Sequence, residues 1–425
     1  MATVRPFMGL RYADTAGEPS TLVAPPYDVI SPEQRETLAS LNPYNVVHLT
    51  LPEQEEGDRS KFVKYARSAA RLEEWRKTGV MKVEQKQSYY RYTQTFSVPG
   101  TRETLSRTKL VTTIKVEPYS NGVVLPHEQT FPKHKEDRMR ILEATRSHLE
   151  CIFGLFEDDD QSVHKLIVDA PGTVVADFVT SDDGIRHVFE KIDDADSCNA
   201  ITAAIAPKKV WIADGHHRYE TALAFRERLG EKDGLIAEDF MMMALCSISD
   251  PGLVLLPTHR ILHKLPVSAD ELSRLLSEQF DVSSCANSDL YQTISTCGTR
   301  AFGVALPGGK GLVAGFDDPD EFVVKMEGAG SADLKRLDVS ILHDFIFAKL
   351  LGLKGHDFFG YTRVEQEAVD AVEHGAPAAF LMNPPSVDDM RSVANSGGFM
   401  PQKSTYYYPK LLSGLVVWSL KDYCV

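Results

Sequence analysis

The feature that most constrains this chain is an apolar segment that runs into a glycine turn and then into a segment of helical character. Val210–Ala213 are apolar and predict a strand, and a short polar string separates them from the helix: Asp214, Gly215, His216, His217 and Arg218. A turn between a strand end and a helix N-terminus presents unpaired backbone N–H groups and the positive end of the helix dipole. The sequence therefore predicts an anion-binding turn at this position.

The side chains of the turn favour phosphate as the anion. Arg218 can donate two parallel hydrogen bonds to phosphate oxygens, and Gly215 allows the backbone to approach an anion closely. His216 and His217 titrate near neutral pH, so they can donate to phosphate or act as acid or base. The alternative is purely structural: Asp214 caps the helix and the histidines are solvated.

Composition limits the classes of partner. The chain has 425 residues, 43% of them hydrophobic, and a net charge of −14. This length suits two or three domains, and the negative charge provides no overall field for nucleic acid or an anionic membrane. The six cysteines are scattered without a CxxC pair, and the N-terminus has no apolar signal core. We therefore expect a cytoplasmic protein that binds neither nucleic acid nor membrane.

Periodicity and turn residues predict an α+β chain in two parts. The main body covers residues 1–265 and 331–425, and a small inserted α+β module covers 266–330. Ser31 and Pro32 indicate a helix start, with serine as the N-cap and proline at the first helical position. We further predict helices over 61–80, 135–148, 193–206 and 332–352, and strands over 87–98, 110–117, 151–156 and 378–382.

Two further segments offer carboxylates for chemistry. His127 and Glu128 place an imidazole beside a carboxylate, which suits proton abstraction or magnesium binding. Pro25 and Pro26 fix the backbone before Asp28 and would present that carboxylate rigidly. The structural alternatives are a charged loop before a helix for the first segment and a turn-forming aspartate for the second.

The C-terminal part adds polar residues that suit contact with a ligand. Lys403, Ser404 and Thr405 are similar to the end of a P-loop, but they lack its glycine-rich lead-in. We therefore predict ligand contacts for these three residues without a Walker site. The stretch Thr258–Arg260, just after an expected strand, is another candidate.

The string Asp214–Arg218 resembles the phosphate-binding turn of free-serine kinases in the ParB/sulfiredoxin-like superfamily. The resemblance implies a mixed-sheet core of that type, with large N-terminal and C-terminal elaborations. Sulfiredoxins need a cysteine where His216 stands here, and ParB proteins carry a Gly-Glu-Arg-Arg turn and a helix-turn-helix. The kinases place a catalytic glutamate shortly before the turn, whereas Asp28 and Glu128 lie far upstream, so the choice of base stays open.

A second resemblance extends over nearly the whole chain. The sequence is similar to the domain of unknown function 1015 family in motifs that occur in the same order: Ala24–Ile30, His127–Glu128, Asp214–Glu220, Pro257–Arg260, Asn383–Pro384 and Met400–Tyr406. The family name implies no activity. Its members are often associated with serine biosynthesis genes, which agrees with the serine-kinase resemblance.

These observations lead to a phosphotransferase acting on free serine or phosphoserine, in either direction. The resemblance implies ATP or ADP as the nucleotide and Mg²⁺ as the bridging ion. Asp214–Arg218, with Lys403, Ser404 and Thr405, would bind phosphate or nucleotide, and Glu128, Asp28 and His127 are the catalytic candidates. No residue is assigned as a metal ligand.

Other functions and assemblies stay open at this point. One is a metal-dependent phosphoesterase, because Asp214–His217 resembles an Asp-His-His signature with a glycine inserted. Another is a non-catalytic protein that binds a nucleotide or metabolite. The 266–330 module is a candidate for a dimerisation element or a substrate lid, so a homodimer is one assembly that we consider.

Overall fold

The computed structural model describes most of the chain as two compact units. It describes residues 1–128, 130, 132–297, 300–326, 330–355, 358–401 and 403–423, without the side chains of 132–134. Unit 1 contains 1–126, 130–254 and 409–425, and unit 2 contains 127–129 and 255–408. Among the described helices, none is long and apolar enough to cross a membrane.

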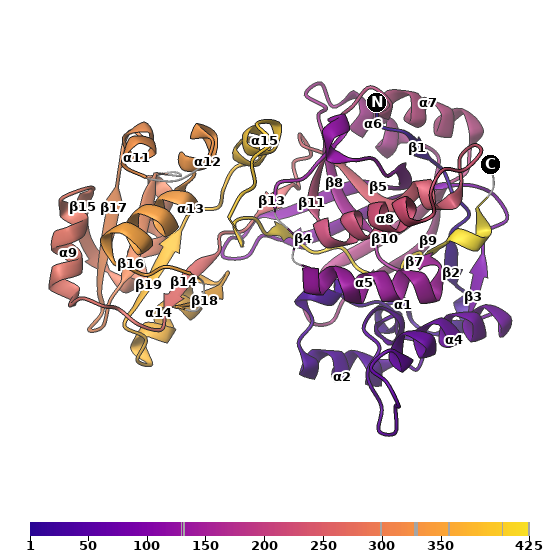
Figure 1. Cartoon of the computed structure of the whole chain (residues 1–425), viewed down its shortest axis with the longest axis horizontal. Helices are drawn as coiled ribbons and strands as arrows, with labels where there is room; N and C mark the ends of the chain where they lie inside the picture. Colours follow the sequence, from indigo (N-terminus) through magenta and orange to yellow (C-terminus); the bar gives the residue numbers. More distant parts are fainter. Residues whose placement is uncertain are drawn as a thin grey trace. The chain divides into compact units, whose positions relative to one another are not determined.

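Unit 1 is built on a nine-stranded mixed sheet (Figure 1). The strand order is β6-β11-β8-β12-β5-β4-β10-β9, with β1 paired to β5. Two pairs, β11 with β6 and β12 with β8, are parallel, and the others are antiparallel. The strands are β1 Val4–Arg5, β4 Tyr89–Ser97, β5 Thr104–Lys115, β6 Val124–Leu125, β8 Ile152–Phe156, β9 Thr173–Val179, β10 Arg186–Ile192, β11 Val210–Asp214 and β12 Phe240–Ser247.

The central strands of unit 1 are buried throughout. Every residue of β8 and β12 is buried, which explains their nearly continuous apolar sequences. The strand predicted for 210–213 is confirmed as β11, which lies between β6 and β8. Because β11 is held on both sides, the residues at its end are placed by the sheet.

Helices surround the sheet of unit 1, and α5 contacts α8 (Figure 1). The predicted helix start at Ser31 is confirmed, since its side chain and that of Gln34 form a capping box on α2. The helices are α1 Pro19–Leu22, α2 Pro32–Leu41, α3 Val47–Thr50, α4 Val63–Lys77, α5 Pro132–Thr145, α6 Ser162–Asp169, α7 Ala195–Ile205 and α8 His216–Arg228. Two small antiparallel sheets complete the unit: β2 Leu10–Tyr12 with β3 Met81–Val83, and β7 Ser147–His148 with β21 Trp418–Ser419.

Unit 2 has a six-stranded antiparallel sheet in the order β15-β17-β16-β19-β14-β18. Helices α10 and α14 contribute leucine, isoleucine and valine side chains to one apolar cluster with the sheet. A second cluster consists of phenylalanine rings around Phe280, Phe322 and Phe345. The strands are β14 His259–Leu262, β15 Asp281–Ala286, β16 Ala301–Ala305, β17 Lys310–Gly315, β18 Phe359–Thr362 and β19 Ala378–Met382.

The helices of unit 2 are mostly short. They are α9 Ala269–Ser277, α10 Leu290–Thr296, α11 Asp320–Lys325, α12 Ala332–Lys335, α13 Asp338–Ser340, the π-helix η6 Ile341–Leu350, α14 Glu365–Glu373 and α15 Val387–Asn395. The single helix expected over 332–352 is wrong, because Leu337 adopts an extended conformation (φ −65°, ψ 135°) and separates α12 from α13. This break places Asp338 at the start of α13.

The α+β prediction is confirmed by the two sheets and the helices that pack on them. The segment 266–330, expected to be a separate module, lies within unit 2. Strand β16 of this segment pairs with β19, whose residues come from the expected main body. Unit 2 therefore continues to residue 408 because its sheet is completed by strands that follow the segment.

Candidate functional site

The predicted strand–turn–helix is present in unit 1. Strand β11 ends at Asp214, Gly215 is the N-cap with φ 95°, and α8 begins at His216. The carbonyl oxygen of Gly215 accepts hydrogen bonds from the amide of Arg218 at 2.9 Å and from that of Tyr219 at 3.1 Å. These bonds close the first turn of α8, so its N-terminus and dipole are directed at the end of β11.

Arg218 is the best-held side chain of the turn. Its guanidinium donates from Nη1 to the carbonyl oxygen of Cys151 at 2.6 Å and from Nη2 to Asp214 Oδ2 at 2.9 Å. The side chain is 9% exposed, and its buried Nε has no hydrogen-bond partner. A Cβ atom on Gly215 would lie 2.9 Å from Nη2 and 3.0 Å from Nε. The absence of a side chain at position 215 therefore lets the guanidinium pack directly against the Gly215 backbone.

Lys410 is a cation of the site that the sequence did not reveal. Its ammonium group forms an ion pair with Asp214 Oδ1, so both carboxylate oxygens of Asp214 contact cations. Burial by itself raises the pKa of Asp214, but Lys410 and Arg218 outweigh burial and hold that pKa well below its usual range. Asp214 is therefore a permanent anion that fixes two cations at the turn. Lys410 follows Lys403, Ser404 and Thr405 by a few residues, but nothing in the local sequence relates it to Asp214.

Two more carboxylates act on Arg218. Burial alone would lower the pKa of Arg218, and the negative charges of Glu150, Asp214 and Asp28 raise it above the usual value. Glu150 is buried and accepts hydrogen bonds from the amide of Tyr27 at 3.1 Å and from Ser413 Oγ at 3.2 Å. Asp28 lies in a short 3-10 helix, Tyr27–Val29, and is exposed. The structure thus places Asp28 within electrostatic reach of the turn.

Arg138 connects Glu150 to this site. Its Nη1 lies 3.4 Å from Glu150 Oε2, and its guanidinium stacks 3.8 Å from the centre of the Tyr27 ring. A cation over an aromatic face is attractive, so Arg138 supports the segment that carries Asp28. In the sequence, Arg138 lies within the helix predicted over 135–148, close after His127 and Glu128. Its relation to Tyr27 depends on the tertiary packing of α5.

The histidines of the turn lie at the start of α8. His216 is buried and contributes to the low pKa of Asp214, whereas His217 is partly exposed. Over the ranges that the structure describes, no group of three or more His, Cys, Asp or Glu side chains is arranged to hold a metal ion.

His127, Glu128 and Thr405, all predicted from the sequence as site residues, form a second cluster in unit 2. His127 is fully buried, and its Nε2 lies 2.9 Å from Thr405 Oγ1. The Thr405 hydroxyl also lies 3.4 Å from Glu128 Oε1, and the amide of Met400 donates to the His127 carbonyl oxygen at 2.7 Å. These bonds join His127, Glu128 and Thr405 into one hydrogen-bonded group.

Lys403 and Ser404, which were predicted with Thr405 to contact a ligand, differ in their surroundings. Lys403 is exposed and has a positive φ of 59°, while Ser404 is buried and donates its hydroxyl to the carbonyl oxygen of Pro401. The structure therefore groups Asp28 with Asp214 and Arg218 in unit 1, and groups Glu128 with Thr405 in unit 2.

The chain belongs to the family described as protein of unknown function (DUF1015), whose model matches residues 4–340. This confirms the family resemblance seen in the sequence. No curated protein matches the chain. Because the family description names no activity, the function has to be argued from the site.

Solved structures with limited similarity to this chain include a free serine kinase in complex with ADP. That protein is 13% identical, the match covers 67% of this chain and 84% of that one, and the TM-score is 0.33. A conserved hypothetical protein from Pyrococcus furiosus is 13% identical, with 71% and 94% coverage and a TM-score of 0.33. SbnI from Staphylococcus aureus with a C-terminal truncation is 11% identical, with 71% and 86% coverage and a TM-score of 0.34.

Proposed function

We propose that this protein is a phosphotransferase that acts on free serine or phosphoserine with a nucleotide. The observation that carries the proposal is the arrangement at the N-terminus of α8, where Arg218 and Lys410 converge on Asp214 beside Gly215. Two cations and the first-turn N–H groups of a helix form an electrostatic environment that suits a phosphoryl group. The choice of serine comes from the resemblance of the Asp214–Arg218 string to free-serine kinases.

In this proposal the turn binds the transferring phosphoryl group. Phosphoryl transfer depends on positioning and charge neutralisation, because charge spreads over the phosphoryl oxygens in the transition state. Arg218 and Lys410 supply positive charge, and Asp214 keeps both cations in place. Gly215 has no side chain, so the phosphoryl oxygens can approach the backbone of the turn closely.

Asp28 is the general base of the proposed reaction. It is exposed, it lies in unit 1 with the turn, and its charge acts on Arg218. In the forward direction the serine Oγ forms a bond to the terminal phosphorus of ATP while the bond from that phosphorus to the ADP oxygen breaks. The serine hydroxyl proton moves to the Asp28 carboxylate, and ADP leaves. The reverse reaction transfers the phosphoryl group of phosphoserine to ADP.

The proposal includes Mg²⁺ bound mainly by the nucleotide. Mg²⁺ in such sites is held by one or two carboxylates together with substrate phosphates, so a cage made only of protein ligands is not required. The nucleotide phosphates would provide most of the ligands, and the ion would neutralise charge on those phosphates.

The decisive experiment measures phosphoserine directly. The full chain is incubated with Mg²⁺ and serine plus ATP, ADP or pyrophosphate, and separately with phosphoserine alone and with ADP. We expect phosphoserine to be made or consumed in at least one mixture, and Arg218→Ala to reduce the rate by about 10³-fold or more. If phosphoserine is neither made nor consumed in any mixture, the proposal is wrong.

A matched pair of variants tests the assignment of the base. Asp28→Asn is expected to lower kcat by roughly 10²–10⁴-fold, because a general base contributes that much. Glu128→Gln, which alters the cluster around Thr405 in unit 2, is expected to retain most of the activity. The opposite pattern would assign the base to Glu128 and refute the role given to Asp28.

The contacts of Asp214 argue against a metal-dependent phosphoesterase. Both of its carboxylate oxygens already contact cationic side chains, and a divalent ion at the same oxygens would be repelled by Lys410 and Arg218. A non-catalytic binding protein is distinguished by the same assay: calorimetry would detect nucleotide or phosphoserine binding, but no turnover would follow.

A further inference from the structure

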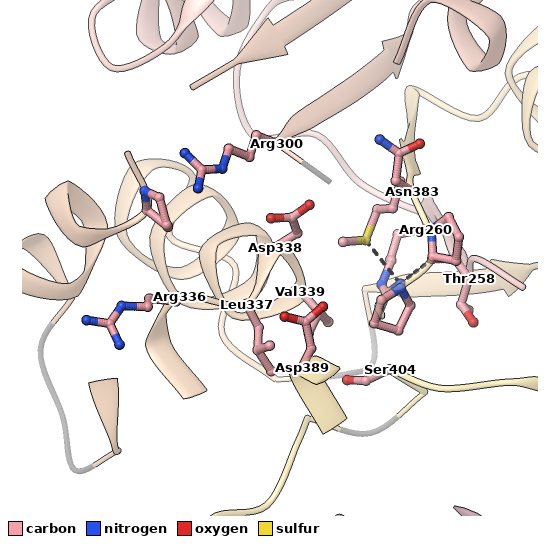
Figure 2. A pocket seen from close by; sticks show the side chains of 14 residues that line it. Thr258, Arg260, Arg300, Arg336, Leu337, Asp338, Val339, Asn383, Asp389 and Ser404 are labelled. Carbon is pink, nitrogen blue, oxygen red and sulfur yellow. Dashed lines mark hydrogen bonds between the residues drawn. The ribbon is translucent and has the colours of Figure 1, made fainter. Parts of the chain in front are cut away.

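Unit 2 contains a cavity of about 200 Å³ that the proposed reaction does not use (Figure 2). This volume is many times the roughly 10–15 Å³ that one water needs, yet it is below the roughly 300–1,000 Å³ of drug-sized pockets. The cavity would therefore admit a small metabolite. Its lining combines arginine, aspartate, serine and asparagine side chains with leucine, valine and proline.

Arg260 is the most unusual group in this lining. It is 1% exposed, and no carboxylate forms an ion pair with it in the part of the chain that the structure describes. Its Nε donates to His343 Nε2 at 3.1 Å, and its Nη1 donates to the carbonyl oxygen of Thr258 and to Met382 Sδ, the latter at 3.3 Å. Its buried Nη2 has no hydrogen-bond partner.

A buried guanidinium without a counter-ion is costly. Burial lowers the pKa of Arg260 to about 10, which shows how strongly this environment disfavours the charge. A carboxylate bound in the cavity would supply the anion that Arg260 lacks, since planar guanidinium groups match carboxylates well. Arg260 therefore indicates the anionic end of a ligand.

Two carboxyl groups of the lining suit the cationic end of a ligand. Asp338 and Asp389 both line the cavity, and in Figure 2 they lie between Arg260 and the side chains of Arg300 and Arg336. Burial and the neighbouring Asp389 raise the pKa of Asp338 well above its usual value, while Arg300 lowers it. Asp389 accepts from the amide and hydroxyl of Ser386, both at 2.8 Å, as part of the cap of α15. A protonated amine beside Asp338 would relieve the repulsion between these two carboxyl groups.

Arg336 is a lining residue of a different kind. It bonds to Asp320 Oδ1 at 2.6 Å and to Asp333 Oδ1 at 3.1 Å, and its side chain is 41% exposed. Its charge is already neutralised by these neighbours. Arg336 therefore provides a matched control for Arg260 within the same cavity.

We propose that the cavity of unit 2 binds a small α-amino acid, with its carboxylate on Arg260 and its ammonium group on Asp338. Leu337 and Val339 on the cavity wall would contact a short side chain. This site is additional to the proposed phosphotransfer site, because its lining contains none of Asp28, Asp214, Arg218 and Lys410.

Met382 provides a local probe of the cavity, because its sulfur contacts Arg260 and it lines the same space. The full chain is labelled with methyl-¹³C methionine, and the Met382 signal is assigned with Met382→Leu. It is titrated with L-alanine, with L-lactate, which lacks the amine, and with L-alaninol, which lacks the carboxylate. L-alanine has no hydroxyl to phosphorylate, so this result is independent of the proposed reaction.

We expect a saturable shift of the Met382 signal with L-alanine, at least tenfold weaker binding of L-lactate, and no shift with L-alaninol. Arg260→Leu should weaken L-alanine binding by about tenfold or more, and Arg336→Leu should leave it within about twofold. Asp338→Asn should weaken L-alanine while leaving L-lactate unchanged, a pattern that misfolding would not produce. The proposal is overturned if L-alanine gives no saturable shift, if L-lactate binds equally well, or if Arg260→Leu binds like the wild type.

Discussion

Arg218 of α8 in unit 1 and Arg260 of β14 in unit 2 both have side chains that are largely buried, but their charges are compensated differently. Arg218 forms an ion pair with Asp214, and the charges of Glu150 and Asp28 also act on it. Arg260 has neutral partners, namely a histidine nitrogen, a carbonyl oxygen, a sulfur atom and the ring of Tyr361. The pKa of Arg218 is accordingly raised, whereas burial lowers that of Arg260 to about 10.

Arg218 is held in place by carboxylates of the folded chain, whereas Arg260 lacks an anion. The carboxylates around Arg218 fix its position, so an incoming phosphoryl group would meet cations that are already oriented. The anion for Arg260 would come from the ligand, so binding would remove a cost that the free protein carries. The same substitution should therefore destabilise the protein much more at Arg218 than at Arg260.

The largest effect on stability is expected for leucine at position 218. Arg218→Leu removes one of the two cations that contact Asp214 and the positive charge near Glu150, so it should cost about 3 kcal/mol or more. Arg260→Leu removes an uncompensated charge and should stay within about 1 kcal/mol of the wild type. Urea unfolding followed by tryptophan fluorescence reports on unit 1, which contains Trp75, Trp211 and Trp418. The Met382 methyl signal reports on unit 2. Equal losses in the two variants would remove the distinction between the arginines.

A smaller effect is expected at the glycines that flank α8. Gly215 has φ 95° and faces the Arg218 guanidinium, while Gly230 has φ 65° and no atom within 4 Å of the point where a Cβ would lie. Both alanine variants should lose about 1–2 kcal/mol because of the left-handed backbone, and Gly215→Ala should lose a further ~1 kcal/mol by displacing Arg218. The control is Gly230→Ala, which should keep full activity in the serine assay. Equal unfolding free energies for the two variants would show that the guanidinium is not held against Gly215.

Acid should weaken unit 1 through Asp214. Burial raises the pKa of this carboxyl, but Lys410 and Arg218 lower it by more than burial raises it. The pKa of Asp214 in the folded state therefore lies below the unfolded value of about 3.9. The ionised Asp214 therefore stabilises the folded state above about pH 4, and this stabilisation is lost as the pH falls through the folded pKa. A tenfold difference in proton affinity between the folded and unfolded states corresponds to about 1.4 kcal/mol. The free energy of unfolding, measured by tryptophan fluorescence between about pH 6 and about pH 2.5, should fall less steeply with decreasing pH in Asp214→Asn than in the wild type. The same pH dependence in both proteins would contradict the ion pairs of Asp214.

The smallest effect is expected for Arg336→Leu. Its ion pairs with Asp320 and Asp333 are at least two-fifths exposed, and such pairs contribute about 0–1 kcal/mol. The free energy of unfolding of unit 2, measured by the Met382 signal in urea, should therefore change by less than about 1 kcal/mol. A larger loss would mean that Arg336 supports the cavity wall.

Local signals made much of the fold predictable. The serine and proline before α2 led to a capped helix, and the apolar run before Asp214 led to a buried strand. The helix expected over 332–352 failed because Leu337 interrupts it, although the residues on both sides suit a helix. Propensity describes neighbours in sequence, and it does not register a backbone conformation that packing imposes.

The candidate sites were predictable only in part. Asp214, Gly215 and Arg218 were found because one turn contains them all. Lys410 and Glu150 were missed because each reaches Asp214 or Arg218 from a distant part of the chain. The cavity residue Asp338 gave no signal, since the sequence predicted one helix over 332–352 and placed this aspartate inside it.

The sequence by itself determined the strand–turn–helix at 210–228, the family, and the α+β class, because these depend on local patterns and ordered motifs. Tertiary structure alone decided that Asp28 shares unit 1 with the turn while Glu128 lies with Thr405 in unit 2. It also decided that Arg218 is paired with a carboxylate and Arg260 is not. The physical reason is that the state of a charge depends on burial and on partners brought close by folding, and neither is encoded at neighbouring positions.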